Sequence, residues 1–259
     1  MLFLSKINDK INKFGEIEML KIYVRSDLKM RKGKMAAQSA HAAMKLLIEV
    51  MTKSKNKLIL NNKEVKRFEN FVNNASIAIV MVNSEEELNL ILDKSKPFSI
   101  IVDSGRTEFH GVKTVTCGAQ GIFEEVDLVE MDVPHIYGRD IVAKQVFIYN
   151  KDHSLSKEHS CRLSVLSCLL NMYNKLKASE YGLEFNLEED TEFNAWILNA
   201  FGKICLSTET LQELNLIEEK LIESNIKFNK VNLGNNYCIC VEPKTPSIID
   251  NITGNLKLI

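Results

Sequence analysis

No hydrophobic run in this 259-residue chain reaches the roughly 18 to 20 residues of a membrane-spanning helix. The apolar start, MLFL, is too short for the core of a signal peptide, and a polar segment follows it. The six cysteines show neither a disulfide framework nor the spacing of zinc ligands. We therefore expect a cytoplasmic globular protein with buried thiols, such as Cys238 and Cys240 on one face of a strand.

The signatures of several enzyme classes are also missing. The sequence has no glycine-rich phosphate loop, no serine elbow and no pair of histidines at metal-ligand spacing. His110 and His135 are isolated, and Cys117 has no obvious base beside it that would make it a nucleophile. From these absences we expect neither a metal ion nor a cofactor.

The net charge is close to zero, at −1, but the charges are unevenly distributed. Residues 1–67 carry an excess of positive charge, whereas residues 121–140 are acidic. A basic segment can bind the phosphate backbone of a nucleic acid. Lysine-rich surfaces are also common in proteins that bind none, so charge alone leaves both interpretations open.

What the sequence does contain is a repeat. Residues 20–44 (LKIYVRSDLKMRKGKMAAQSAHAAM) and 144–168 (KQVFIYNKDHSLSKEHSCRLSVLSC) both have the pattern of a strand, a basic loop and a helix. Three polar positions keep their identity at a constant offset of about 125 residues: Asp27 and Asp152, Lys32 and Lys157, Ser39 and Ser164. This period is too long for a solenoid and indicates a duplicated domain.

Alternating strands and helices predict the fold class: α/β, with two tandem three-layer α/β/α domains, each a small mixed sheet with helices on both faces. We place the domains at 20–140 and 141–259, with their boundary near 135–143. Residues 1–19 would be an N-terminal extension with a short amphipathic helix. We expect residues 52–66 to be largely a loop and residues 180–192 to be a long acidic connection.

The first polar cluster lies on one predicted helix. Lys34, Gln38 and His41 are spaced i, i+4 and i+7, so they share one face. A lysine at a helix start can meet an anion or an oxyanion beside free backbone N–H groups. The second copy has His159, Leu163 and Leu166 at these positions. This loss of polarity indicates that one copy carries the chemistry and the other supports it.

The second polar cluster is the segment DSGRT. Asp103 ends a predicted strand, Ser104 and Gly105 make a turn, and Arg106 and Thr107 follow. Thr114 opens the next strand. A lone DSGRT is also typical of a capped turn. The matching stretch of the second copy, KVNLGNNYCIC, lacks the aspartate, arginine and threonines, and the loss of both clusters from one copy favours a functional role.

These two segments carry a resemblance to a known family. VRSDLKMRKGKMAAQSAHAAM together with IIVDSGRTEFHGVKTVTCG resembles the type 2 peptidyl-tRNA hydrolases of archaea and eukaryotes. The family's closing signature is absent from the first copy and is found instead at the chain end, in EPKTPSIIDNITGNLKLI. The resemblance covers nearly the whole chain, as two tandem copies.

The resemblance implies hydrolysis, without a metal, of the ester that joins a peptide to the 3′ end of tRNA. By position, the family's essential lysine, aspartate and threonine match Lys34, Asp103 and Thr107. Lys34 would bind the terminal phosphate or stabilise the oxyanion, Asp103 would orient or deprotonate water, and Thr107 would bind the carbonyl or the water. The later threonine matches Thr114, although the spacing is one residue shorter here.

Substrate contacts are expected from a further set of polar and basic residues in the first copy: Arg25, Lys29, Arg31, Lys32, Gln38, His41, Arg106 and Thr114. The partner would be tRNA, with no role for a membrane. The second copy would be a pseudoenzyme that replaces a subunit, which predicts a monomer with an internal pseudo-dimer. The alternative is a non-catalytic tRNA- or protein-binding module that retains the hydrolase fold.

Overall fold

The computed structural model of the protein describes residues 19–54, 56–124, 143–151, 155–189, 191–198 and 201–259. The predicted helix near the N-terminus lies outside this range except for Met19. The predicted domain boundary near 135–143, with His135, falls outside it as well, except for Ala143, and so does Asp152. None of the described helices is long and apolar enough to cross a lipid bilayer.

The first copy builds a four-stranded mixed sheet in the order β4-β1-β6-β5. β1 is parallel to β4 and antiparallel to β6. Helix α2 packs on one face and α4 on the other. The bounds of these elements and of α3 are β1 Leu20–Arg25, α2 Lys32–Glu49, α3 Asn62–Asn74, β4 Ile77–Val82, α4 Glu85–Ile91, β5 Phe98–Asp103 and β6 Thr114–Gln120.

The second copy repeats this topology. Its sheet has the order β11-β12-β7-β10-β13, in which β7 is again parallel to one neighbour and antiparallel to the other. The bounds are β7 Lys144–Asn150, α5 Lys157–Tyr173, α6 Thr191–Leu198, β10 Lys203–Thr208, α7 Leu211–Glu223, β11 Phe228–Leu233, β12 Asn236–Lys244, α8 Pro246–Thr253 and β13 Lys257–Leu258. The predicted fold class, two tandem α/β units, is confirmed.

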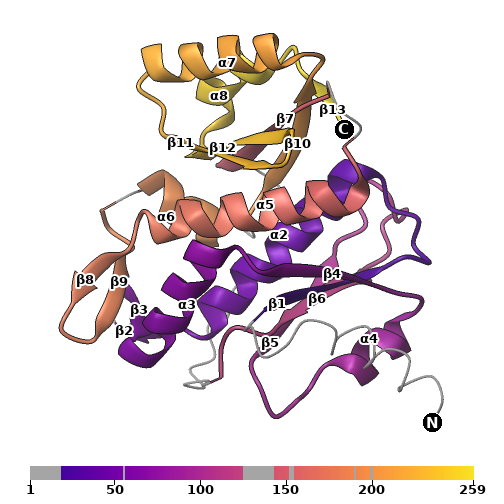
Figure 1. Ribbon diagram of the computed structural model, residues 1–259, viewed down its shortest axis with the longest axis vertical. Coiled ribbons are helices and arrows are strands. Elements are labelled where there is room, and N and C mark those ends of the chain that lie inside the picture. The colour runs from indigo at the N-terminus through magenta and orange to yellow at the C-terminus, as the bar shows by residue number, and fades with distance from the viewer. Residues whose placement is uncertain (1–18, 55, 125–142, 152–154, 190, 199–200) are drawn as a thin grey trace.

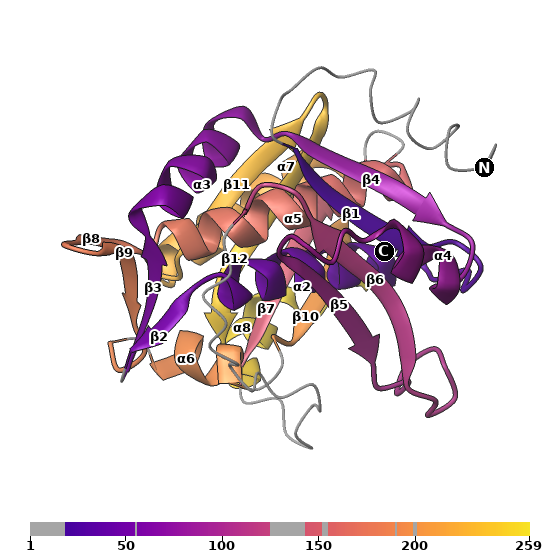
Figure 2. The same cartoon turned by 90° about the horizontal axis from the view of Figure 1, so that it is seen from below.

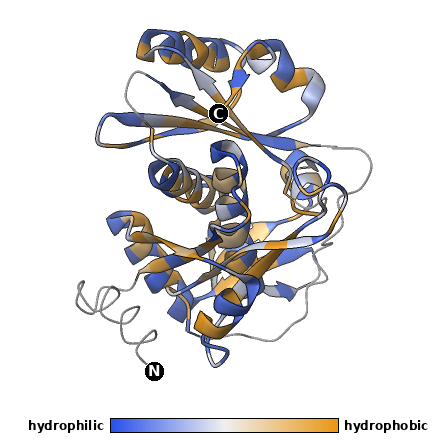
Figure 3. Ribbon diagram, turned by 90° about the vertical axis from the view of Figure 1, so that its right-hand side faces the viewer, coloured by the Kyte–Doolittle hydropathy of each residue, from blue (hydrophilic) through white to orange (hydrophobic). Residues whose placement is uncertain are grey.

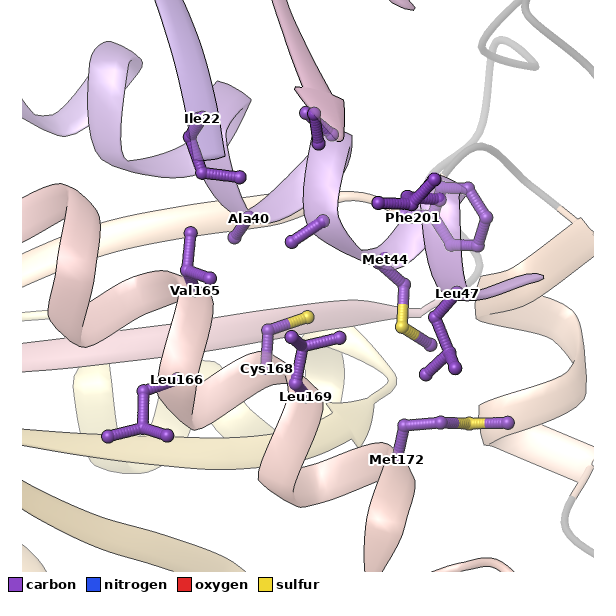
Figure 4. Packing of buried hydrophobic residues seen from close by; sticks show 14 of the residues in the cluster. Ile22, Ala40, Met44, Leu47, Val165, Leu166, Cys168, Leu169, Met172 and Phe201 are labelled. Carbon is purple, nitrogen blue, oxygen red and sulfur yellow. The ribbon is translucent and has the colours of Figure 1, made fainter. Parts of the chain in front are cut away.

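The two copies share a central layer of helices. In Figure 1, α7 and α8 cover the outer face of the second sheet, α5 and α2 lie between the two sheets, and α4 lies below the first sheet. Figure 4 shows Ala40, Met44 and Leu47 of α2 facing Cys168 and Leu169 of α5. One buried hydrophobic cluster runs through both copies, and two smaller clusters lie on the outer sides.

Small and apolar residues allow this close helix contact. Ala36, Ala40 and Ala43 of α2 are almost completely buried, so the two backbones can approach closely. The outer helix α7 is different, because hydrophilic and hydrophobic residues alternate along it at the top of Figure 3. Its apolar side packs on the sheet through Leu214 and Leu221, as expected for an amphipathic surface helix.

Two further hairpins join the copies and correct the sequence prediction. Residues 52–66 are not mainly a loop, because they contain β2 (Thr52–Ser54) and β3 (Lys57–Asn61) before α3 begins. The connection at 180–192 likewise contains part of a hairpin, formed by β8 (Lys177–Ser179) and β9 (Gly182–Asn186). β3 pairs with β9, so both hairpins form one sheet in the order β2-β3-β9-β8 (Figure 2). Each hairpin would be only marginally stable alone, and the pairing partner lies in the other copy.

Candidate active site

A pocket of about 360 Å³ lies between the two copies. The first copy supplies the start of α2 and the segment that follows β5, and the second copy supplies β10 and the residues around β13. Its lining includes seven of the predicted site residues: Arg31, Lys34, Gln38, His41, Asp103, Arg106 and Thr107. The predicted contacts Arg25, Lys29, Lys32 and Thr114 are not among the lining residues.

An ion pair between Lys34 and Asp103 forms the centre of the site. The ammonium of Lys34 bonds to Oδ2 of Asp103, and both side chains are largely buried. Nε2 of Gln38 donates to the same Oδ2 at 2.7 Å. The backbone N–H of Gly105 donates to Oδ1 at 2.8 Å. A buried carboxylate that accepts from this many donors is held in one orientation.

The turn after Asp103 requires a glycine. Gly105 has a φ of +81°, and a Cβ atom there would lie 2.5 Å from the carbonyl oxygen of Val112. Only glycine adopts this backbone conformation without strain. The turn brings Thr107 back to the site, where its Oγ1 accepts a hydrogen bond from Nζ of Lys34 at 3.1 Å. Lys34 also lies 5.6 Å from the ring centroid of Phe109.

The threonine that joins this network is not the predicted one. The hydroxyl of Thr114 donates to the carbonyl of Val112, outside the pocket. Thr116 is fully buried and donates to Oε1 of Gln38 at 3.1 Å. It thereby orients the amide of Gln38 so that the amide nitrogen faces Asp103. Neither Thr116 nor Phe109 belongs to a motif that the sequence alone would reveal.

His41 connects the pocket to the second copy. Its Nε2–H donates to the carbonyl of Phe201 at 2.8 Å. Burial holds the pKa of His41 well below its ordinary value of 6.5, and the nearby charges of Lys203 and Lys34 lower it further. The imidazole is therefore neutral at physiological pH and serves as a fixed polar group at the interface.

The predicted tRNA-binding cations differ in what they contact. Arg25 is largely buried and bonds to Asp27, Glu85 and the carbonyl of Val115, so it stabilises the fold. Its side-chain hydrogen bond with Asp27 raises the pKa of Arg25 and lowers that of Asp27. Arg31 pairs with Glu108 at 2.6 Å but remains 66% exposed. Lys29 is exposed.

Lys32 takes part in a contact between the copies. Its ammonium donates to the carbonyl of Leu155, and the matching Lys157 donates to the carbonyl of Met30 at 3.1 Å. Met30 and Leu155 occupy equivalent positions of the repeat. The reciprocal bonds show that the two copies are related by a pseudo-twofold arrangement.

The equivalent positions of the second copy hold no such polar network. The strand pairings place Leu233 at the position of Asp103 and Tyr237 at the position of Thr116. Leu163 replaces Gln38 and is fully buried. The second copy therefore has leucines where the first copy has the carboxylate of Asp103 and the amide of Gln38. Among the described residues, no three His, Cys, Asp or Glu side chains gather in a way that could hold a metal ion.

Comparison with known proteins agrees with this geometry. A family model described as "Peptidyl-tRNA hydrolase PTH2" matches residues 19–129 and 143–259. A protein of Saccharolobus islandicus (strain L.S.2.15) named peptidyl-tRNA hydrolase is 40% identical over 102 residues, covering 37% of this chain and 78% of the relative. The proteins of the same name from Saccharolobus solfataricus and Sulfolobus acidocaldarius are 39% identical over 102 residues and 37% identical over 106 residues. They cover 37% and 39% of this chain, and 78% and 82% of their own length is matched.

Because the family model matches twice, once in each copy of the fold, the chain belongs to the peptidyl-tRNA hydrolase PTH2 family as a tandem duplication.

Proposed function

We propose that this protein hydrolyses the ester bond between peptide and tRNA, at the pocket that contains Lys34 and Asp103. One observation carries the proposal: Lys34, Gln38, Asp103 and Thr107 form a single hydrogen-bonded network on the pocket wall. The relatives' name, peptidyl-tRNA hydrolase, supports the same activity. Water would attack the carbonyl carbon of the ester and the bond from that carbon to the 3′ oxygen of the tRNA would break. One proton of the water would pass to the 3′ oxygen, and the other would be released to solvent from the new carboxyl group of the peptide.

The contacts of Lys34 favour oxyanion stabilisation over phosphate binding. A lysine ammonium has three N–H donors. In Lys34, one of them bonds to Asp103 and a second bonds to Thr107. One donor remains for the substrate. A preorganised donor that faces the carbonyl oxygen stabilises the negative charge that develops there in the transition state.

The contacts of Asp103 favour a positioning role over proton abstraction. Lys34 and Gln38 bond to one of its oxygens, and the N–H of Gly105 bonds to the other. Donors of the protein itself therefore already occupy both oxygens of the carboxylate. Asp103 would hold the ammonium of Lys34 in place on the pocket wall. Thr107 accepts from Lys34, so its own O–H is available to orient the ester carbonyl or the attacking water.

The second copy would act as a pseudoenzyme that supports the first. We place the division between the copies near residue 141 and expect a monomer, because the fused second copy already completes the pocket of the first. Of the basic residues outside the pocket, exposed Lys29 is the one we expect to meet the tRNA backbone. A cytoplasmic location, with the translation machinery, follows from the proposed substrate.

The test is turnover of a model peptidyl-tRNA, such as N-acetyl-aminoacyl-tRNA, by the purified chain. We expect release of free tRNA with multiple turnovers. The rate should persist after the protein has been treated with a chelator and assayed with magnesium supplied only to fold the tRNA. Binding of tRNA without turnover would contradict the proposal and would favour the non-catalytic alternative.

A further inference from the structure

The two copies differ at the strand positions that face the central helices: the second copy has polar residues there and the first copy has apolar ones. By the pseudo-twofold arrangement, α2 packs against β10 of the second copy and α5 packs against β4 of the first. The strand registers place Gln145 and Lys203 of the second copy at the positions of Leu20 and Ile77 in the first. Polar residues therefore replace apolar ones on the second copy where it faces the helix that carries Lys34.

Lys203 lines the pocket and is held by groups of its own copy. Its Nζ donates to the carbonyl of Phe201 at 3.1 Å, the same oxygen that accepts from His41. It lies 4.4 Å from the ring centroid of Trp196 and 5.1 Å from that of Phe201. Lysine over tryptophan is a favourable cation–π contact and fixes the direction of the side chain.

The other lysines of the pocket wall face carboxylates, and Lys203 does not. Lys34 pairs with Asp103, and Lys144 pairs with Asp250. Within the described part of the chain, no carboxylate lies within ion-pair distance of Lys203, and burial lowers its pKa to about 8. A cation in this position is costly unless an anion joins it. The pocket is open to the ligand, so the missing counter-ion can come from the substrate.

We propose that Lys203 binds a phosphate group of the tRNA acceptor end, so that the second copy contributes a substrate-binding residue to the active site of the first. The inference rests on the proposed function, since peptidyl-tRNA is the substrate that brings phosphates next to the ester. Lys34, His41 and Lys203 line the same pocket. An acceptor end with its ester at Lys34 can therefore extend toward Lys203.

The experiment compares Lys203→Met, Lys203→Arg and a control, Lys230→Met, in the full-length protein. Lys230 also lies over an aromatic ring of the second copy, Tyr237, but outside the pocket. Loss of one charge-assisted contact should raise KM for peptidyl-tRNA about tenfold with kcat nearly unchanged. Lys203→Arg should stay within about threefold of the wild type because it keeps the charge, and Lys230→Met should match the wild type.

The dependence of kcat/KM on salt concentration distinguishes a lost phosphate contact from a loss of packing, because a loss of packing would leave this dependence unchanged. For a single-stranded acceptor end, Lys203→Met should reduce the slope of log kcat/KM against log salt by about 0.7. An unchanged KM and slope in Lys203→Met, or a lower kcat at constant KM, would overturn the proposal. If Lys203→Met fails to fold, as judged by thermal unfolding, Lys203→Gln replaces it.

A second arm separates this inference from the proposed function. Binding of deacylated tRNA is measured for the wild type and Lys203→Met. A wild type that binds tRNA but hydrolyses no peptidyl-tRNA would refute the proposed activity, while about tenfold weaker binding by the variant would still support the phosphate contact. Equal tRNA binding by both proteins would refute the contact whatever the activity.

Discussion

At the scale of single residues, the site depends on one buried carboxylate that organises its neighbours. Asp103 is 4% exposed and accepts hydrogen bonds from a backbone amide, an amide side chain and an ammonium. Removing its charge would leave Lys34 without a counter-ion in a buried position, where an unpaired charge is costly. Asp103 therefore both stabilises the turn at Gly105 and holds Lys34 in place.

Asp103→Asn should reduce kcat by about 100-fold or more, on the order of the loss of one preorganised electrostatic group. The shape of the side chain is kept, so the hydrogen bond from Gly105 should survive and the fold should persist. The measurement is steady-state hydrolysis of peptidyl-tRNA beside a circular dichroism spectrum. A folded variant with a rate near that of the wild type would refute the role of Asp103.

Thr116→Val should have a smaller effect. It removes the donor that fixes the amide of Gln38 while keeping the shape of the side chain. The loss of one neutral hydrogen bond corresponds to a decrease in kcat of about tenfold. Thr114→Val is the matched control, because the hydroxyl of Thr114 bonds to the carbonyl of Val112 away from the pocket. A larger loss in the control than in Thr116→Val would show that the wrong threonine is assigned.

Helical spacing was sufficient to predict Lys34, Gln38 and His41 on one pocket wall, whereas Thr116 could not be predicted in this way. Its place depends on an irregularity between β5 and β6, where Ile101 pairs with Cys117 and Val102 pairs with Val115. Thr116 is the extra residue, and such bulges redirect a side chain without leaving a pattern in the sequence. Lys203 was missed because its significance depends on a packing partner in the other copy.

At the scale of secondary-structure elements, the contact between α2 and α5 holds the molecule together. Small residues form the centre of this contact, and a larger side chain there would push the two helices apart. Ala40→Leu should lower the free energy of unfolding by about 1 to 3 kcal/mol, as overpacked cores do. Urea denaturation checks this value. Ala178→Leu, on the exposed strand β8, is the control, and equal losses in the two variants would contradict the assigned role of the helix contact.

The order of strands and helices could be predicted from the sequence, because the repeat and its apolar runs are local signals. The strand β1 and the helix α2 follow one another from residue 20 onward, as the pattern of a strand, a basic loop and a helix predicts. The hairpins β2-β3 and β8-β9 were missed, since each is short and polar and is stabilised by the pairing of β3 with β9. Pairing between segments this far apart in the sequence leaves no periodicity to detect.

At the scale of the whole molecule, duplication allows two equivalent surfaces to differ. A symmetric pair of separate subunits must carry the same residue on both sides of an interface. In this chain one side has Lys203 beside His41, and the other has Ile77 and Leu166 at the matching positions. Fusion also keeps the copies at a high effective concentration. The monomeric state remains a prediction.

The buried cysteines of the core predict that the stability of the fold changes at alkaline pH. All six cysteines are free and buried, and burial raises the pKa of each thiol above its ordinary value of 9.0. The unfolded chain therefore loses thiol protons first as the pH rises, which favours unfolding. Lys203 acts in the opposite direction, because its lowered pKa of about 8 destabilises the folded state at low pH, and this penalty disappears as the pH rises from 8 to 10.5.

Six thiols outnumber one lysine, so the free energy of unfolding should fall between pH 8 and pH 10. The measurement is the urea midpoint at both pH values with a reducing agent present. An unchanged or higher midpoint at pH 10 would show that the buried thiols do not dominate the alkaline response.

The central claim is that one copy carries out the reaction and the other supports it. The most direct measurement compares kcat/KM for peptidyl-tRNA in two variants at matching positions of the repeat, Lys34→Ala and His159→Ala. We predict a loss of about 100-fold or more in Lys34→Ala. In His159→Ala we predict no measurable change, because the second copy lacks partners equivalent to Asp103 and Gln38. Comparable losses in the two variants, or a loss in His159→Ala alone, would contradict the account.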